Sequence, residues 1–157
     1  MTFRKKALLS TIASDSHSWN LVFMEFFLNE NGYDVVNLGP CTQVEDVTDA
    51  LDKGYYDLVV ISTVNGHGAY EGPELAEEIR DVAGFELDLV IGGKIATRND
   101  TKTIRAAKAE LRKAGFDAVF DDSEKNTFDA FQAFIDRPRG PAVGLGQRTP
   151  ITEYLSL

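Results

Sequence analysis

The fold class of this chain is decided by the stretch DLVVIST at residues 57–63. Four aliphatic residues follow one another in it, and three of the four are β-branched. A strand with one face in water would alternate apolar and polar residues, whereas an unbroken apolar run is typical of a strand buried on both faces. The stretch therefore predicts a central strand of a parallel sheet that helices cover from both sides.

Outward from this stretch, strand-like segments alternate with helix-like segments along the whole chain. The five predicted strands are residues 7–13, 33–38, 57–63, 87–91 and 118–120. A regular alternation of this kind is the pattern of an α/β domain. We therefore expect a flavodoxin-like (Rossmann-like), doubly wound α/β fold with five parallel strands in the order 2-1-3-4-5.

Local signals place the helices between these strands. Residues 21–31 are densely apolar and end before Gly32, a common residue after a helix C-terminus. Thr42, with Glu45 three residues on, resembles a capping box at the start of the second helix. Pro73 is expected at the first position of the third helix. The residues predicted to face the core are Leu75, Ile79 and Val82 in the third helix, Ile104, Ala107 and Leu111 in the fourth, and Phe128, Phe131, Phe134 and Ile135 in the fifth.

The composition excludes several classes of partner. The chain has 157 residues, with 16 Lys or Arg against 25 Asp or Glu, so its formal charge is −9. Nucleic acid would need a basic face that displaces counterions from phosphates, so we expect no nucleic-acid partner. No apolar run approaches the roughly 20 residues that span a bilayer, so we expect no membrane partner. The single cysteine, Cys41, excludes an internal disulfide and fits a cytoplasmic location, and we interpret it as a small loop residue.

The composition changes near residue 138. Residues 138–157 contain three of the five prolines and three glycines. We expect this segment to be an extended arm without a core of its own. The chain is therefore divided into a domain at residues 1–137 and a C-terminal arm at residues 138–157.

The predicted topology points to one edge of the sheet as the binding site. In open parallel sheets, ligands bind beyond the carboxyl ends of the strands, near the point where the strand order reverses. With the order 2-1-3-4-5, the loops after the first, third and fourth strands form one rim. Three unusual segments fall on this rim: SDSHS at residues 14–18, STVNGHG at 62–68 and GGKI at 92–95.

Asp15 and His17 form the sharpest signal on the rim. A histidine that binds a metal through one ring nitrogen commonly donates its other N–H to a carboxylate, which fixes the tautomer. At a spacing of two residues in an extended loop, the two side chains lie on the same side and within reach of that bond. Taken alone, the pair also fits a surface histidine beside an aspartate that caps a helix.

The other rim residues each allow two interpretations. Ser62 could bind a ligand through its hydroxyl, or the hydroxyl could be satisfied by nearby backbone. Gly92 and Gly93 remove two Cβ atoms, which suits either the close approach of a ligand or a tight turn. His67 could face a ligand or simply be exposed.

Two other uses of the fold do not fit these residues. A phosphoacceptor receiver domain needs an aspartate at the end of the third strand and a lysine at the end of the fifth. The chain has residues 62–63, serine and threonine, at the first place and Phe120 at the second. A flavin-binding domain needs a glycine-rich phosphate loop after the first strand, and residues 14–20 contain no glycine.

The three segments resemble motifs of the cobalamin-binding domain shared by vitamin B12-dependent mutases and methionine synthase. The family's Asp-x-His-x-x-Gly is matched from Asp15 to Trp19, with Asn20 in place of the glycine. Its Ser-x-Leu is matched by residues 62–64, with valine last, and its Gly-Gly by residues 92–93. The resemblance runs over about residues 5–137 and is greatest to the separate small subunit of glutamate mutase (methylaspartate mutase).

The resemblance implies a site for adenosylcobalamin. His17 would be the axial ligand to cobalt in place of the cofactor's own dimethylbenzimidazole, and Asp15 would hold the far ring N–H of His17. The nucleotide tail would pass Ser62 and run over Gly92 and Gly93. The residues implied to contact the cofactor are Ser14, Asp15, Ser16, His17, Ser18, Ser62, Thr63, Val64, Gly92, Gly93, Lys94, Ile95, Ala96 and Thr97.

The resemblance also implies a division of labour between two chains. The small chain would carry the cofactor, and a larger TIM-barrel subunit would hold the substrate, in an assembly of two small and two large chains. Together they would interconvert glutamate and 3-methylaspartate, and the small chain, to which we assign no catalytic residue, would be inactive alone. A corrinoid-binding sensor or carrier, or a corrinoid methyltransferase module, would share the same motifs.

Two substitutions are expected to report on the site. Asp15→Asn should weaken cofactor binding and leave thermal stability almost unchanged. Gly93→Val should exclude the nucleotide tail while the helices and strands stay intact.

Overall fold

The computed structural model describes residues 4–138, which contain one sheet of five parallel strands. The strands are β1 (Lys5–Ser10), β2 (Tyr33–Asn37), β3 (Leu58–Thr63), β4 (Asp88–Gly93) and β5 (Ala118–Asp121). Their order is β2-β1-β3-β4-β5, and every neighbouring pair is parallel, so the predicted flavodoxin-like topology is confirmed. Apart from Pro138, the predicted arm lies outside the described residues.

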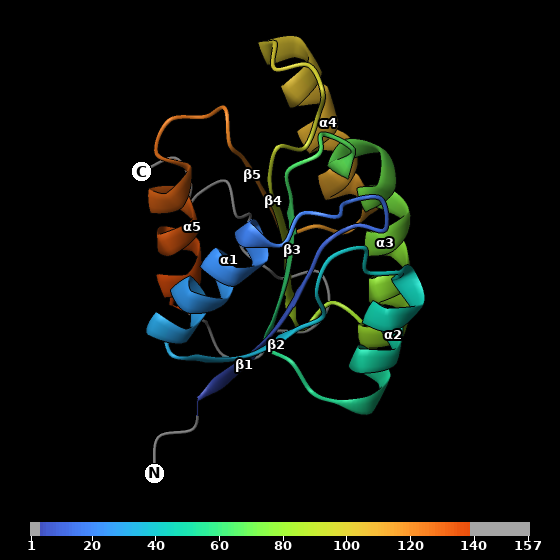
Figure 1. Cartoon of the computed structure of the whole chain (residues 1–157), viewed down its shortest axis with the longest axis vertical. Helices are drawn as coiled ribbons and strands as arrows, with labels where there is room; N and C mark the ends of the chain where they lie inside the picture. Colours follow the sequence, from blue (N-terminus) through green and yellow to red (C-terminus); the bar gives the residue numbers. More distant parts are fainter. Residues whose placement is uncertain (1–3, 139–157) are drawn as a thin grey trace.

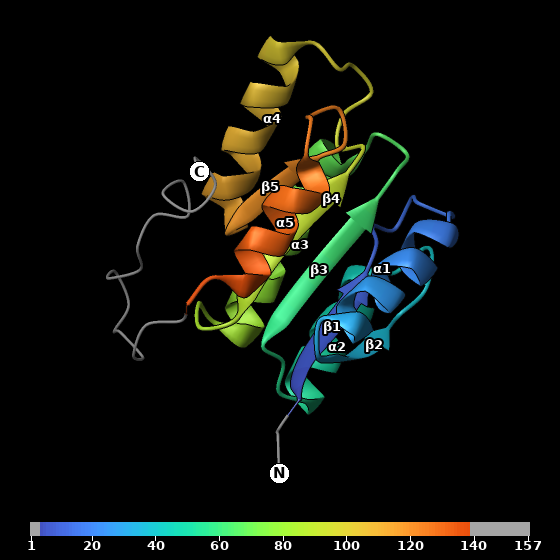
Figure 2. The same cartoon turned by 90° about the vertical axis from the view of Figure 1, so that its left-hand side faces the viewer.

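Helices cover both faces of this sheet. They are α1 (Trp19–Glu30), α2 (Val44–Lys53), α3 (Gly68–Ala83), α4 (Thr101–Ala114) and α5 (Thr127–Asp136). α1 and α5 lie on one face, and α2, α3 and α4 lie on the other (Figure 1). Figure 2 shows α1 and α5 in front of the sheet, on either side of β3. Within residues 4–138, no helix is long and apolar enough to cross a membrane.

Each face of the sheet has its own core, and β3 contributes to both. All six residues of β3 are buried, which explains the unbroken apolar run. Successive side chains of a strand point to opposite faces. Val59 and Ile61 accordingly pack in the core beneath α2 and α3, while Leu58 and Val60 pack in the core beneath α1 and α5.

The third helix begins earlier than predicted. α3 starts at Gly68, with His67 at the N-cap, and Pro73 lies inside the helix rather than at its first position. The Ala69 N–H, in the first turn, donates to the Ile95 carbonyl at 2.8 Å. The loop after β4 thus supplies an acceptor that the start of a helix requires. This partner comes from a distant part of the chain, so local sequence signals could not reveal it.

The capping box predicted at Thr42 is wrong by one residue. Gln43 is the N-cap of α2, and its N–H donates to Asp46 Oδ2 at 3.0 Å. Thr42 is buried instead, where its hydroxyl donates to the Gly39 carbonyl at 2.6 Å and accepts the Thr11 N–H at 3.4 Å. Thr42 therefore satisfies backbone groups in the loops after β1 and β2 rather than the start of the helix.

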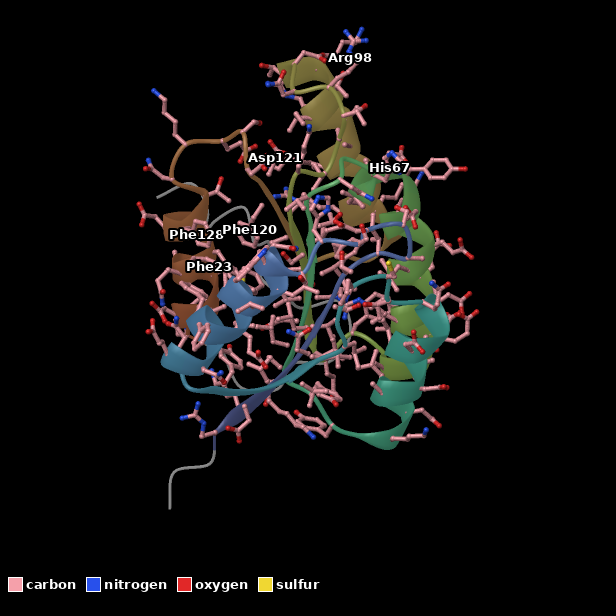
Figure 3. All side chains as sticks on the ribbon, in the orientation of Figure 1. Phe23, His67, Arg98, Phe120, Asp121 and Phe128 are labelled. Carbon is pink, nitrogen blue, oxygen red and sulfur yellow. The ribbon has the colours of Figure 1, made fainter. Side chains whose placement is uncertain are left out.

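Two side chains predicted to face the core are exposed. Val82 at the end of α3 is 42% exposed, and Phe128 at the start of α5 is 50% exposed. Phe128 packs edge-on against Phe23 of α1, with 5.3 Å between ring centroids (Figure 3). Both residues lie in a terminal turn of their helix, which extends beyond the edge of the core although the apolar periodicity of the sequence continues there. The other predicted core residues of α3, α4 and α5 are buried.

Four of the five strands end elsewhere than predicted, two of them by more than one residue. β1 ends at Ser10 rather than at residue 13. β4 continues to Gly93 rather than ending at residue 91, because residues 92–93 pair with residues 62–63 of β3. The glycine pair is therefore part of the sheet and not of the loop that follows it.

Candidate functional site

The loop after β1 holds Asp15 and His17 in direct contact. Asp15 Oδ1 lies 2.7 Å from His17 Nδ1 and also accepts the His17 backbone N–H at 3.0 Å. Asp15 Oδ2 accepts the Thr63 hydroxyl and the Val64 N–H, each at 2.8 Å. One fully buried carboxylate therefore joins the loop after β1 to the end of β3.

This carboxylate selects the tautomer of a neutral His17. A carboxylate only accepts hydrogen bonds, so Nδ1 carries the hydrogen in the contact with Asp15. Nε2 is then left with its lone pair, as a histidine that binds a metal through Nε2 requires. The side chain of His17 is 60% exposed. The rim thus presents an oriented imidazole that can bind a metal.

Asp15 stays ionised despite its burial. Burial raises the pKa of the carboxyl, but hydrogen bonds outweigh this effect and lower the pKa to about 2. The donors are the backbone N–H groups of Val64 and His17, the ring of His17 and the hydroxyl of Thr63. Each of them stabilises the charged form of the carboxylate. The result is a negative charge behind the imidazole at neutral pH, which increases the basicity of the imidazole as a ligand.

The serines of this loop are exposed around His17. Ser14 is held by α3 and the loop before it, because its hydroxyl donates to Glu71 and accepts from Asn65 Nδ2 at 2.9 Å. Ser18 is the N-cap of α1, but its side chain makes no capping hydrogen bond. The loop is therefore anchored at its start, with exposed hydroxyl groups next to the imidazole.

Ser62 lies in a row that crosses three strands. It pairs with Gly92 of β4, and Gly92 pairs with Phe120 of β5. Phe120 belongs to the core beneath α1 and α5, and the alternation along β3 places Ser62 on that same face as Val60. The structure thus brings Ser62 and Gly92 together on the face that α1 covers.

Asn20 reaches this row from the first turn of α1, and the sequence did not predict it as a site residue. Its Nδ2 donates to the Ser62 carbonyl at 3.1 Å and to the Ser62 hydroxyl at 3.0 Å. The available signal was the mismatch with the family motif. An amide in place of glycine, where a helix meets a sheet, must find partners for its polar atoms.

The backbone of the protein itself comes close to both glycines of β4 and makes a glycine necessary at position 93. A Cβ on Gly93 would lie 2.0 Å from the Thr63 carbonyl oxygen, and the φ of Gly93 is +104°. A Cβ on Gly92 would lie 3.0 Å from the Phe120 carbonyl oxygen. The groups that closely approach these glycines in the structure are the backbones of the neighbouring strands. A contact with a cofactor tail stays a prediction.

Residues 94–97 leave the sheet and join the rim through their backbone. The Lys94 N–H donates to the Thr63 carbonyl at 2.9 Å. Ile95 and Ala96 are buried in the core beneath α2 and α3, on the face opposite to Ser62, whereas the side chains of Lys94 and residue 97 are exposed. His67 is also exposed, at the outer edge of the rim (Figure 3).

A family model matches most of the chain. The model described as the B12 binding domain matches residues 5–132. The chain belongs to the B12-binding domain family. The match spans all five strands and includes the Asp15–His17 pair, Ser62 and the two glycines of β4.

The chain is similar to several proteins named glutamate mutase sigma subunit. It is 28% identical to the one from Halobacterium salinarum over 149 residues, which cover 94% of this chain and 93% of that protein. It is 29% identical to sigma subunit 1 of Haloarcula marismortui over 117 residues, 74% of this chain and 76% of that protein. It is 27% identical to the sigma subunit of Clostridium tetanomorphum over 118 residues, which cover 74% of this chain and 84% of that protein.

Solved structures share the fold of this B12-binding domain. A cobalamin-binding protein from Desulfitobacterium hafniense superposes with a TM-score of 0.63 at 19% identity, over 82% of this chain and 56% of that one. The monomethylamine corrinoid protein of Methanosarcina barkeri superposes with a TM-score of 0.61 at 19% identity, over 82% of this chain and 57% of that one. The chain thus spans little more than half the length of these two proteins, and the likeness concerns the fold alone.

Proposed function

We propose that this chain is the cobalamin-binding small subunit of a cytoplasmic, glutamate mutase-like enzyme that uses adenosylcobalamin. Membership of the B12-binding domain family supports the cofactor. Similarity to sigma subunits over almost the whole of both chains supports the role as a small subunit. The observation that carries the proposal is the contact between Asp15 and His17, because it orients a free imidazole nitrogen at the rim.

The residues at the rim fit a corrinoid. His17 would bind cobalt through Nε2, and Asp15 would hold the ring in one tautomer and one orientation. Ser62 would offer its hydroxyl to the nucleotide tail, on the face of the sheet that α1 covers. When bound, adenosylcobalamin supplies a carbon radical by homolysis of its cobalt–carbon bond. The share of this chain is to bind the cofactor and to tune the cobalt through its axial ligand.

The chain should bind cobalamin with its benzimidazole displaced and His17 on the cobalt. Electron paramagnetic resonance of the cob(II)alamin complex should show coupling to one nitrogen, and labelling histidine with ¹⁵N should change that coupling. The chain has only two histidines, so His67→Gln is a matched control that should keep the signal, whereas His17→Gln should lose it. Coupling to the benzimidazole nitrogen in the wild-type protein would contradict the assignment.

We also propose that a larger TIM-barrel subunit binds glutamate and 3-methylaspartate, in an assembly of two small and two large chains. The name shared by the relatives, glutamate mutase sigma subunit, supports this substrate pair. A dicarboxylate substrate needs charged donors that clamp its carboxylates. Lys94 and Arg98 are the basic residues next to the motifs, and Arg98 already pairs with Asp100 at 3.3 Å. We therefore place the substrate on the partner.

The chain alone should be inactive and should gain mutase activity when the larger subunit is added. A carbon radical must be shielded from water, and one open-sheet domain cannot enclose both cofactor and substrate. The test mixes the purified chain and adenosylcobalamin with the larger subunit from the same genome, and follows the conversion of glutamate to 3-methylaspartate. Turnover without the larger subunit would disprove the division of labour. Cofactor binding without activity or complex formation would instead favour a corrinoid sensor or carrier.

A further inference from the structure

The side-chain amide of Asn20 has a defined orientation. Its nitrogen, Nδ2, donates to both the carbonyl and the hydroxyl oxygen of Ser62. A backbone carbonyl can only accept a hydrogen bond, so the amide nitrogen must be the atom that faces Ser62. The amide oxygen, Oδ1, therefore occupies the other position.

This amide oxygen is buried without a donor. Among residues 4–138, Asn20 Oδ1 is one of three buried side-chain atoms that lack a hydrogen-bond partner, and Thr11 Oγ1 is another. Thr11 directly follows β1, which lies beside β3 in the sheet. Buried acceptors in folded proteins are nearly always paired, because an unpaired one loses its hydration without compensation. Asn20 thus holds a buried acceptor that no donor of the described chain satisfies.

The hydroxyl of Ser62 complements this acceptor. Because Ser62 Oγ accepts from Asn20, the hydroxyl hydrogen must point elsewhere. Within the described part of the chain, no hydrogen bond uses that hydrogen. Ser62 and Asn20 therefore offer one donor and one acceptor next to each other, on the face of the sheet beneath α1.

We propose that Asn20 is a specificity-determining residue that, with Ser62, selects corrinoids by the chemistry of their lower base. This inference rests on the proposed function, which brings the nucleotide tail past Ser62. Adenine presents an N–H donor beside a ring-nitrogen acceptor. Such a base satisfies both Asn20 Oδ1 and the Ser62 hydroxyl. Dimethylbenzimidazole has the acceptor nitrogen but no N–H or O–H donor, so it leaves the Asn20 oxygen unpaired. Glycine, the motif residue at position 20, offers no side-chain acceptor.

The test compares two adenosylcorrinoids that differ in the lower base, one with adenine and one with dimethylbenzimidazole. Their dissociation constants are measured by equilibrium dialysis with the full chain. The wild-type protein should prefer the adenine form by roughly 3- to 10-fold, the value of about one net hydrogen bond. In Asn20→Ala the preference should disappear. Asn29→Ala, the same change at an exposed position of α1, should keep it.

Circular dichroism and a thermal melt establish that each variant is folded, and Asn20→Gly serves as a second variant if the alanine variant is not. Equal affinities of the wild-type protein for the two corrinoids would overturn the inference, as would an unchanged preference in the folded Asn20 variant. Both results leave the proposed cofactor intact. If the wild-type protein binds neither corrinoid, the proposed function fails and the inference fails with it.

Discussion

Replacing Gly93 with alanine should lower the free energy of unfolding by at least about 3 kcal/mol. The new Cβ would lie 2.0 Å from the Thr63 carbonyl oxygen, within the paired strands β3 and β4, where the backbone cannot move away cheaply. A φ of +104° adds strain for any residue with a Cβ. Backbone strain and overpacking each cost about 1–3 kcal/mol. Scanning calorimetry should show a melting temperature lower by roughly 10 °C.

Gly32→Ala is the matched control for this prediction. Gly32 also has a positive φ, +87°, but nothing lies within 4 Å of its would-be Cβ. Its substitution should therefore cost only the conformational penalty, about 1–2 kcal/mol. If the free energy of unfolding fell by the same amount in both variants, the contact with Thr63 would not contribute to the cost of Gly93→Ala. The expectation that Gly93→Val leaves the fold intact is corrected by this contact, so lost cofactor binding in that variant would not locate the nucleotide tail.

Asp15→Asn should weaken cobalamin binding by about 10- to 100-fold, the usual effect of removing the partner of a metal-binding histidine. The structure adds an effect on the fold, contrary to the expectation of unchanged thermal stability. Asp15 is fully buried, and its two oxygens receive donors from His17, Thr63 and Val64. An amide replaces one of these oxygens with a donor, so at least one buried donor loses its acceptor. The stability loss should be about 2–4 kcal/mol by chemical denaturation at neutral pH.

The pH dependence of stability shows whether the charge of the Asp15 carboxylate, rather than the substitution in general, causes the loss of stability in Asp15→Asn. The pKa of Asp15 is lowered from 3.8 to about 2 in the folded chain. A lowered pKa stabilises the fold above pH 4, and the stabilisation, about 2 kcal/mol, is lost as the pH falls towards 2. The difference between wild type and Asp15→Asn should therefore shrink over this range. Asp46→Asn, at the exposed start of α2, is the control and should cost about 1 kcal/mol. A difference that stays constant between pH 4 and pH 2 would rule out an ionised Asp15 as its cause.

Much of the fold followed from the sequence because the signals are local. A short apolar run rich in β-branched residues and without alternation is typical of a strand with two covered faces, and β3 is buried along its whole length. The contact between Asp15 and His17 was predictable for the same reason, since the two residues are two positions apart in one loop. Helices were harder to delimit, because periodicity continues past the end of the core, as the exposure of Val82 and Phe128 shows.

By itself, then, the sequence determined the alternating strands and helices and the histidine with its carboxylate, because hydrophobic runs and short spacings fix these features locally. The strand order and the rim were expected from the fold class that this alternation indicates. Only the tertiary structure decided what surrounds them. The start of α3 depends on the Ile95 carbonyl, and Gly93 is required by Thr63 on the neighbouring strand. Asn20 meets Ser62 across 42 positions of the chain. Contacts of this kind are set by strand register and helix packing, which place backbone atoms from distant segments within a few ångströms of each other.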